Sequence, residues 1–369
     1  MVLRMNLNIQ KTILAISDKI NMQYTHEHYM QRCIQLAEKG KANVKPNPMV
    51  GSVIVYNDTI IGEGYHQIYG EAHAEVNAIN SVKDKSLLKE STLYVNLEPC
   101  AHHGKTPPCS DLIVEKQIKR VVIGCIDSFA KVAGKGIEKM QKAGIEVIVG
   151  ILEKESLELN KAFFNFHTNK RPYIILKWAQ TLDGFIDIKR KEDDAVGINW
   201  ITHPSLKLIV HKWRSEETAI LIGNGTLRND NPKLDTREWY GKNPLRILLS
   251  KDKKISTDYK LLDGSTETLV FSNSEKLNIP KTTFIKLNNK ENPIKQVLNE
   301  LYSRDIQTLI VEGGRETLQS FIDNNLWNEA RVLIGDKTFG EGLSAPIINK
   351  SHKENIRINK DTILFYKNN

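Results

Sequence analysis

Residues 71–110 read EAHAEVNAINSVKDKSLLKESTLYVNLEPCAHHGKTPPCS, and this stretch decides the fold of the first half of the chain. Its apolar spacing predicts a helix over 72–82, a strand over 91–99 and a second helix over 110–117. The short β-branched runs RVVIGCID (120–127) and IEVIVG (145–150) follow, and such runs are typical of buried parallel strands. Strands that alternate with helices indicate layers of helices packed on a sheet.

The residues before this stretch extend the same pattern. Apolar residues recur at helical spacing over 25–39. The β-rich runs MVGSVIVYN (49–57) and TIIGEGYHQ (59–67) meet at Asn57-Asp58, which predicts a hairpin. We therefore expect a three-layer α/β/α domain over residues 23–150, preceded by a loosely ordered tail over 1–22 that does not read as a secretory signal.

A second α/β series begins after residue 170. Residues 151–170 predict a helix followed by a polar connector, and RPYIILKWA (171–179) starts a new strand. Later strand-like runs are ETAILIG (217–223), PLRILLS (244–250), TETLVFSN (266–273), IQTLIVEGG (306–314) and EARVLIG (329–335). The sequence thus predicts a second α/β domain over 171–369, in keeping with about 150 residues per domain in a chain of 369.

The composition is that of a soluble globular protein. Hydrophobic residues make up 40% and charged residues 26%, and no apolar run approaches the roughly 18 residues of a membrane helix. Four cysteines fit a reducing compartment, so we expect a cytoplasmic protein, with Cys33 and Cys125 packed in the core. The net charge of +8 allows nucleic acid, an anionic membrane surface or phosphorylated small molecules as partners.

His73, Cys100 and Cys109 are the candidate ligands of a catalytic zinc ion. One imidazole and two thiolates leave the fourth tetrahedral position for water, whose pKa zinc lowers towards neutrality. Glu75 lies two residues beyond His73 at a predicted helix start, where a carboxylate can move protons without binding the metal. His-x-Glu with a downstream Pro-Cys and a second Cys is typical of zinc-dependent base deaminases.

The spacing departs from the common deaminase pattern, because eight residues rather than two separate the cysteines. Three alternatives stay open on the residues alone. The site could be a structural zinc site, closed by His102 or His103, in a binding or regulatory module. The chain could deaminate nucleic-acid bases, although no basic groove with interleaved aromatic residues is evident. The first domain could also be an active deaminase while the second domain no longer catalyses a reaction.

Several segments of the first half resemble the deaminase domain of the bifunctional riboflavin-biosynthesis deaminase–reductase family. They are KPNPMVGSVIV (45–55), GEGYH (62–66), EAHAEVNAI (71–79), LEPCAHHGKTPPC (97–109) and VAGKGIEKMQKAGIEV (132–147). The resemblance implies a cytidine-deaminase-like fold, zinc held by His73, Cys100 and Cys109, and proton transfer by Glu75. It also implies substrate contacts by Asn47, His102, His103 and Lys105.

The second half resembles the reductase domain of the same family, which is related to dihydrofolate reductase. The matching segments include LKWAQTLDGFI (176–186), INWIT (198–202), HKWRSEETAILIGNGTLRNDNPKLDTR (211–237), NPLRILLS (243–250) and VEGG (311–314). There is no G-x-G-x-x-G, so an ordinary Rossmann site is disfavoured. By this resemblance NADPH is bound at Ala179, Trp200, Thr226, Asp230, Gly314, Arg315, Glu316, Thr317, Leu318, Gln319 and Ser320.

The substrate of the reductase is expected at Arg214, Leu234, Arg237 and Glu312. Arginines suit a phosphate because their planar donors bind it in a bidentate way. Lys177 and Glu312 are the titratable groups that could supply a proton. Trp200 and Leu234 could equally be core residues, and Ile198 stands where relatives often carry a serine, which puts its role in doubt.

The resemblance implies two successive reactions on a small phosphorylated pyrimidine. The first is zinc-dependent hydrolytic deamination of 2,5-diamino-6-ribosylamino-4(3H)-pyrimidinone 5′-phosphate. The second is NADPH-dependent reduction of the ribosyl group of 5-amino-6-ribosylaminouracil 5′-phosphate to ribityl. Neither nucleic acid nor a membrane is expected as a partner, and the chain could form a homo-oligomer.

Overall fold

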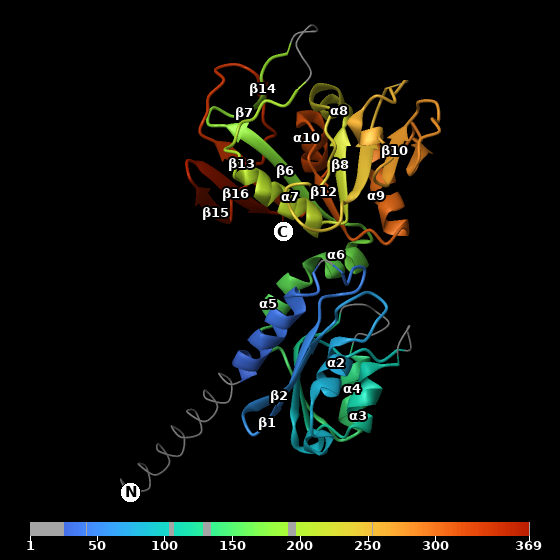
Figure 1. Ribbon diagram of the computed structural model, residues 1–369, viewed down its shortest axis with the longest axis vertical. Coiled ribbons are helices and arrows are strands. Elements are labelled where there is room, and N and C mark those ends of the chain that lie inside the picture. The colour runs from blue at the N-terminus through green and yellow to red at the C-terminus, as the bar shows by residue number, and fades with distance from the viewer. Residues whose placement is uncertain are drawn as a thin grey trace, which may run out of the picture. The chain divides into compact units, whose positions relative to one another are not determined.

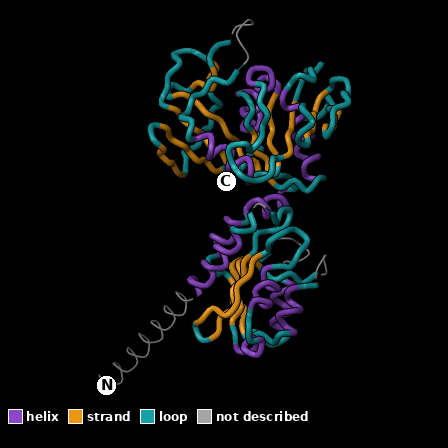
Figure 2. The backbone as a smooth tube through the Cα atoms, viewed as in Figure 1, coloured by secondary structure: helices purple, strands orange, loops and turns teal. Residues whose placement is uncertain are grey.

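The computed structural model describes residues 26–41, 43–102, 107–127, 134–190, 197–252 and 254–368. It divides into two compact units, Met1–Thr168 and Asn169–Asn369 (Figure 1). Strands and helices alternate along most of both units (Figure 2). The predicted tail over 1–22 lies outside the described residues, and the domain limits at 150 and 171 stay predictions.

The first unit contains a five-stranded sheet in the order β2-β1-β3-β4-β5. Strands β1 (Gly51–Tyr56) and β2 (Thr59–Tyr65) form the predicted antiparallel hairpin. Asn57 and Asp58 both have positive φ, 45° and 55°, as a type I′ turn requires. Strands β3 (Thr92–Leu97), β4 (Arg120–Cys125) and β5 (Glu146–Val149) run parallel to one another.

Helices cover both faces of this sheet, which gives the predicted three layers. One apolar cluster joins α2 (Ala74–Ser81), α3 (Cys109–Glu115) and α4 (Lys135–Lys142) to one face. A helix over 26–38 packs Met30, Cys33 and Leu36 against the other face. The short 3-10 helix η1 (Lys85–Glu90) precedes β3, and α5 (Glu153–Leu159) and α6 (Lys161–Asn169) end the series. The expected connector is therefore largely helical.

The second unit contains a nine-stranded sheet in the order β11-β10-β9-β8-β12-β6-β13-β16-β15. The first seven strands of this order, from β11 across the sheet to β13, are parallel. Strands β16 and β15 add an antiparallel hairpin at the edge. The strands are β6 (Tyr173–Thr181), β8 (Ala219–Gly223), β9 (Leu245–Leu249), β10 (Thr268–Ser272), β11 (Thr282–Lys286), β12 (Thr308–Val311), β13 (Glu329–Gly335), β15 (Glu354–Ile358) and β16 (Asp361–Lys367). The separate pair β7 (Phe185–Asp187) and β14 (Leu343–Ser344) is short.

Alternate residues of these strands face two helical layers. Helices α9 (Pro293–Ser303) and α10 (Arg315–Asp323) pack on one face, in a cluster that contains Val332. Helix α7 (Leu206–Glu216) lies on the other face, where its Trp213 ring contacts the guanidinium of Arg331. The remaining short helices are α8 (Asn224–Asp230) and η2 (Lys260–Leu262).

The structure confirms the α/β class and the expected strands of both halves. Cys33 and Cys125 are buried as predicted, and burial raises the pKa of Cys125 to about 12. Among the described residues, no helix is both long enough and apolar enough to cross a membrane.

Replacement of Phe271 by alanine tests the core of the second unit. Phe271 is completely buried in its main apolar cluster. Its loss should lower the free energy of unfolding by about 3–5 kcal/mol, because a cavity is left, whereas Phe271→Leu should cost clearly less. All five tryptophans (178, 200, 213, 239 and 327) belong to this unit, so tryptophan fluorescence during urea unfolding reports on it alone. Equal unfolding curves for the alanine variant and the parent would contradict the assigned packing.

Candidate active sites and family

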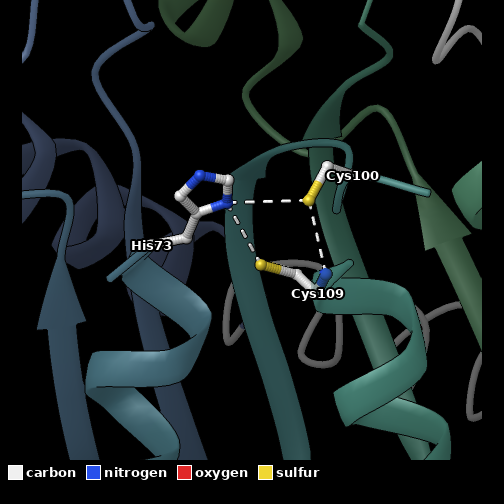
Figure 3. Close-up of side chains that lie close together, drawn as sticks. All are labelled: His73, Cys100 and Cys109. Carbon is white, nitrogen blue, oxygen red and sulfur yellow. Dashed lines mark hydrogen bonds between the residues drawn. The ribbon is translucent and has the colours of Figure 1, made fainter. Parts of the chain in front are cut away.

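His73, Cys100 and Cys109 meet at one edge of the first sheet (Figure 3). His73 caps the start of α2, Cys109 is the first residue of α3, and Cys100 follows β3. The His73 Nδ1 atom lies 3.6 Å from the Cys100 Sγ atom and 3.3 Å from the Cys109 Sγ atom. The Cys109 backbone N–H also donates to the Cys100 Sγ atom at 3.3 Å.

These three donor atoms fit a tetrahedral zinc ion. Zn–S bonds of about 2.3 Å and Zn–N bonds of about 2.0 Å place ligand atoms roughly 3.5–3.8 Å apart. The three atoms lie within 4.8 Å of one another, and no fourth His, Cys, Asp or Glu of the described chain joins the group. His102 is exposed and outside the group, so among described residues nothing closes the site as a structural one would require.

The two thiols have different pKa values. The pKa of Cys100 falls to about 4, because Cys109 and His73 hydrogen-bond to its sulfur. The pKa of Cys109 is raised well above its ordinary value by that same interaction and by burial. A soft thiolate beside an imidazole is the donor set that zinc prefers.

Glu75 lies in the first turn of α2 and is only 3% exposed. Burial raises its pKa to about 7, although the nearby His73 acts in the opposite direction. Its Oε2 atom has no hydrogen-bond partner among the described residues. A buried carboxylate with a pKa near neutrality and a free oxygen is suited to take up and release protons.

Asn47 is held by His66, a residue to which the sequence assigned no role. The His66 Nδ1 atom lies 3.1 Å from the Ala72 carbonyl oxygen and must therefore carry the proton. Its Nε2 atom accepts from the Asn47 Nδ2 group at 3.1 Å. The orientation of the Asn47 amide is thereby fixed, with the amide oxygen left for another donor. The position of His66 near the end of the predicted strand, within the family segment GEGYH (62–66), was the signal that could have indicated this.

Glu98 is the second residue to which the sequence assigned no role. It follows β3 directly and is 4% exposed. Its carboxylate accepts from the backbone N–H groups of Asp127, Gly134, Gly136 and Ile137 at 3.0–3.4 Å. These bonds fix the start of α4 beside the Pro99-Cys100 segment. His103 and Lys105 lie outside the described residues, so their predicted contacts remain predictions.

The second unit holds a cavity of about 830 Å³ at the carboxyl ends of its parallel strands. A volume of this size suits a small ligand together with part of a cofactor. Of the predicted reductase residues, the lining includes Lys177, Ala179, Trp200, Arg214, Thr226, Asp230, Leu234, Arg237, Glu312, Gly314, Arg315, Glu316, Thr317 and Ser320. The structure thus brings most of a widely spaced set of residues together.

Glu312 is the charged centre of this cavity. Its carboxylate accepts from Arg214 Nε at 2.8 Å and Nη2 at 2.7 Å, and from Lys177 Nζ at 3.3 Å. The three side chains are 7–14% exposed. Burial alone would raise the pKa of Glu312, but the two cations hold it at about 2. Burial lowers the pKa of Lys177, which makes its proton easier to release.

Glycines at the end of β8 and after β12 let these segments pack closely against Thr317 of α10. A Cβ atom on Gly223 would lie 2.1 Å from the Thr317 Oγ1 atom, and one on Gly313 would lie 2.9 Å from the Thr317 Cβ atom. Gly314 caps α10 without a side-chain hydrogen bond, so the first N–H groups of this helix have no capping partner. Such N–H groups bind phosphates, and Gly313 and Gly314 line the cavity, so this helix start fits the diphosphate of NADPH.

Some predicted NADPH residues do not reach the cavity with their side chains. Leu318 is completely buried in the core, because its position on α10 faces the sheet. The Gln319 amide instead bonds to Asp323 and to the Ile347 N–H group. The core alternative for Trp200 is wrong, since this residue is 47% exposed, whereas Leu234 is 2% exposed and still forms a cavity wall.

A polar cluster around Asp187 was also missed by sequence reasoning. Its carboxylate accepts from Arg190 Nε at 2.8 Å and from Asn199 Nδ2 at 2.6 Å, beside Ile198 in the cavity wall. Burial and the proximity of Asp187 raise the pKa of Asp230 to about 6. No sequence signal singled out Asp187, and the charged run KRKEDDAVG (189–197) begins two residues after it.

Two family models match the chain. The cytidine and deoxycytidylate deaminase zinc-binding region matches residues 23–125, and the RibD C-terminal domain matches residues 172–364. The riboflavin biosynthesis protein RibD of Aquifex aeolicus is 38% identical, over 92% of this chain and 98% of the relative. That of Escherichia coli is 32% identical, over 85% of this chain and 88% of the relative.

Solved structures agree with this assignment. A crystal structure of the Thermotoga maritima diaminohydroxyphosphoribosylaminopyrimidine deaminase/5-amino-6-(5-phosphoribosylamino)uracil reductase matches with a TM-score of 0.84 and 36% identity. The match covers 94% of this chain and 99% of that chain. Acinetobacter baumannii RibD matches with a TM-score of 0.81 and 29% identity, over 93% and 98% of the two chains. The chain belongs to the RibD family of riboflavin biosynthesis, as a bifunctional enzyme with a zinc-dependent deaminase domain and an NADPH-dependent reductase domain.

Proposed function

We propose that the first unit deaminates 2,5-diamino-6-ribosylamino-4(3H)-pyrimidinone 5′-phosphate and that the second reduces the ribosyl group of 5-amino-6-ribosylaminouracil 5′-phosphate. The observation that carries the first half is the buried Glu75 carboxylate beside the His73, Cys100 and Cys109 donors. The Lys177–Glu312–Arg214 group in the cavity of the second unit supports the other half. The substrates follow those named for the Thermotoga relative.

In the deamination, water adds to the ring carbon that bears the amino group, and ammonia leaves. Zinc, held by His73, Cys100 and Cys109, supplies Lewis-acid activation of water when bound. Glu75 takes a proton from the water and passes it to the ring nitrogen, and then moves the proton of the added hydroxyl group to the departing amine. The Asn47 amide oxygen, fixed by His66, accepts a hydrogen bond from the substrate. The exposed His102 and the predicted residues His103 and Lys105 supply further contacts to it.

Glu75→Gln should lower the turnover of ammonia release by about 10²–10⁴, because the amide cannot shuttle protons. Ammonia release from the diaminopyrimidinone ribotide and NADPH oxidation with predeaminated substrate are measured separately. The second rate should stay close to that of the parent. Unchanged ammonia release in the variant would remove Glu75 from the proposed chemistry.

Cys109→Ser should abolish zinc retention during dialysis against a chelator, since a serine hydroxyl is a poor ligand for zinc. The parent should retain about one ion per chain by elemental analysis. Cys125→Ser is the matched control, because Cys125 is equally buried but its Sγ atom bonds to the Asn96 carbonyl oxygen. Equal zinc content in the two variants would contradict the assigned ligand set.

In the reduction, NADPH supplies a hydride to the ring-opened form of the ribosyl group when bound. The turn at Gly313 and Gly314 and the start of α10 bind the cofactor diphosphate, with Thr226, Arg315 and Ser320 beside them. Lys177 protonates the carbonyl oxygen or imine nitrogen that is bonded to the carbon that accepts the hydride. Arg214, Leu234 and Arg237 bind the substrate. Glu312 keeps Lys177 and Arg214 charged and oriented.

Glu312→Gln should abolish most NADPH oxidation and destabilise the second unit by about 3–5 kcal/mol at pH 7, because two buried cations lose their counter-charge. The folded-state pKa of Glu312 lies at about 2, below the ordinary value of 4.5 for a glutamate. Its stabilising contribution is therefore present above pH 4.5 and lost as the pH falls towards 2. The stability gap between parent and variant, followed by tryptophan fluorescence, should narrow in that window.

The exposed Glu341 provides the surface control for this experiment. Glu341→Gln should match the parent at every pH. A stability gap for Glu312→Gln that stays constant from pH 7 to pH 3 would show that the carboxylate charge is not what stabilises the unit.

The proposed partners are small phosphorylated pyrimidines and NADPH, with no nucleic acid and no membrane, in the cytoplasm. Arg214 and Arg237 beside the cavity support an anionic substrate. A salt-resistant gel shift with RNA at physiological ionic strength would contradict this part of the proposal.

A further inference from the structure

His211 is a buried imidazole in the wall of the second-unit cavity that forms no hydrogen bond with any described residue. It lies on α7 and is 4% exposed, and its Nδ1 atom is buried without a partner. Arg214 follows three residues later, so both side chains lie on the same face of the helix. A buried polar ring without a partner is costly, unless a ligand supplies the missing bond.

The surroundings of His211 are those of an anion site. The positive charges of Arg214 and Arg237 lower the pKa of His211, and the negative charges of Asp235 and Glu312 raise it. Burial and these arginines lower the pKa of His211 to about 4, so the ring is neutral and keeps one N–H donor. The neutral donor adds a hydrogen bond without a further buried positive charge.

Arg214 cannot surround an anion alone. Its Nε and Nη2 groups donate to Glu312, and Nη1 donates to the Asp235 carbonyl oxygen at 3.2 Å. Two of its five N–H groups are therefore left for a ligand. Arg237 also shares a donor with the Asp235 carboxylate. A phosphate monoester has three terminal oxygens, each of which accepts hydrogen bonds, so further donors are needed.

We propose that His211 donates a hydrogen bond to the 5′-phosphate of the reductase substrate, as a specificity-determining residue that acts together with Arg214 and Arg237. This inference rests on the proposed reductase function. A contact with a sugar hydroxyl would not need the two neighbouring arginines, whereas a dianionic phosphate accounts for all three side chains.

The test measures NADPH oxidation with the predeaminated 5′-phosphate substrate and with the same compound lacking its phosphate. His211→Phe removes the donor but fills the space, and His211→Gln keeps an N–H donor. In the parent, KM should be much lower for the phosphorylated compound. His211→Phe should raise that KM about tenfold to a hundredfold, with little change in kcat and little change for the compound without phosphate. His211→Gln should recover a large part of the preference.

Each other outcome has a distinct meaning. An unchanged phosphate preference in His211→Phe, or a fall in kcat at constant KM, would overturn the role of His211. A parent enzyme that oxidises NADPH with neither compound would instead overturn the proposed reductase function. Tryptophan fluorescence during urea unfolding shows whether each variant is folded. If the phenylalanine variant is not, His211→Gln and His211→Ala decide, since only the alanine variant should lose the preference.

Discussion

In each unit a buried glutamate directly follows a strand near the centre of the sheet. Its carboxylate needs hydrogen-bond or charged partners, and this need constrains the neighbouring site. Glu98 follows β3 and Glu312 follows β12. A carboxylate buried at such a place must be fully satisfied, since an unpaired one would cost several kcal/mol (about 3–5 where a buried partner is removed). The groups that satisfy each glutamate are therefore fixed in place, and they are the groups that define the neighbouring site.

The two glutamates are satisfied in different ways, which correspond to different chemistry. Backbone N–H groups surround Glu98, so this residue fixes the course of the chain beside Cys100 and adds no charged partner. Side-chain cations surround Glu312, so this residue opposes the lowering of the Lys177 pKa by burial and orients Arg214. A metal site needs donor atoms at set distances, whereas a reductase site for an anionic substrate needs charge.

The sequence already indicated that the three candidate zinc donors would lie together, because each lies at the end of a local element. His73 and Cys109 begin helices, and Cys100 follows a strand, so a linear motif already contains the geometry. The reductase cavity draws on β6, α7, α8, α10 and the turn after β12, and only the order of strands in the sheet brings these segments together. The predicted run 314–320 included Leu318, because a continuous run ignores the helical period that turns this residue into the core. The hairpin of β15 and β16 escaped prediction, since most of β15 is exposed and polar.

All the donors of the zinc group belong to the first unit, and every residue lining the large cavity belongs to the second. The donor group and the cavity lining therefore have no described residue in common. This separation suits opposite demands on proton affinity. Burial raises the pKa of Glu75 to about 7, where a carboxylate can exchange protons, while two cations hold the pKa of Glu312 at about 2, where it stays ionised. One site could not hold a glutamate in both states, because the cations that keep Glu312 ionised would also remove the proton from Glu75.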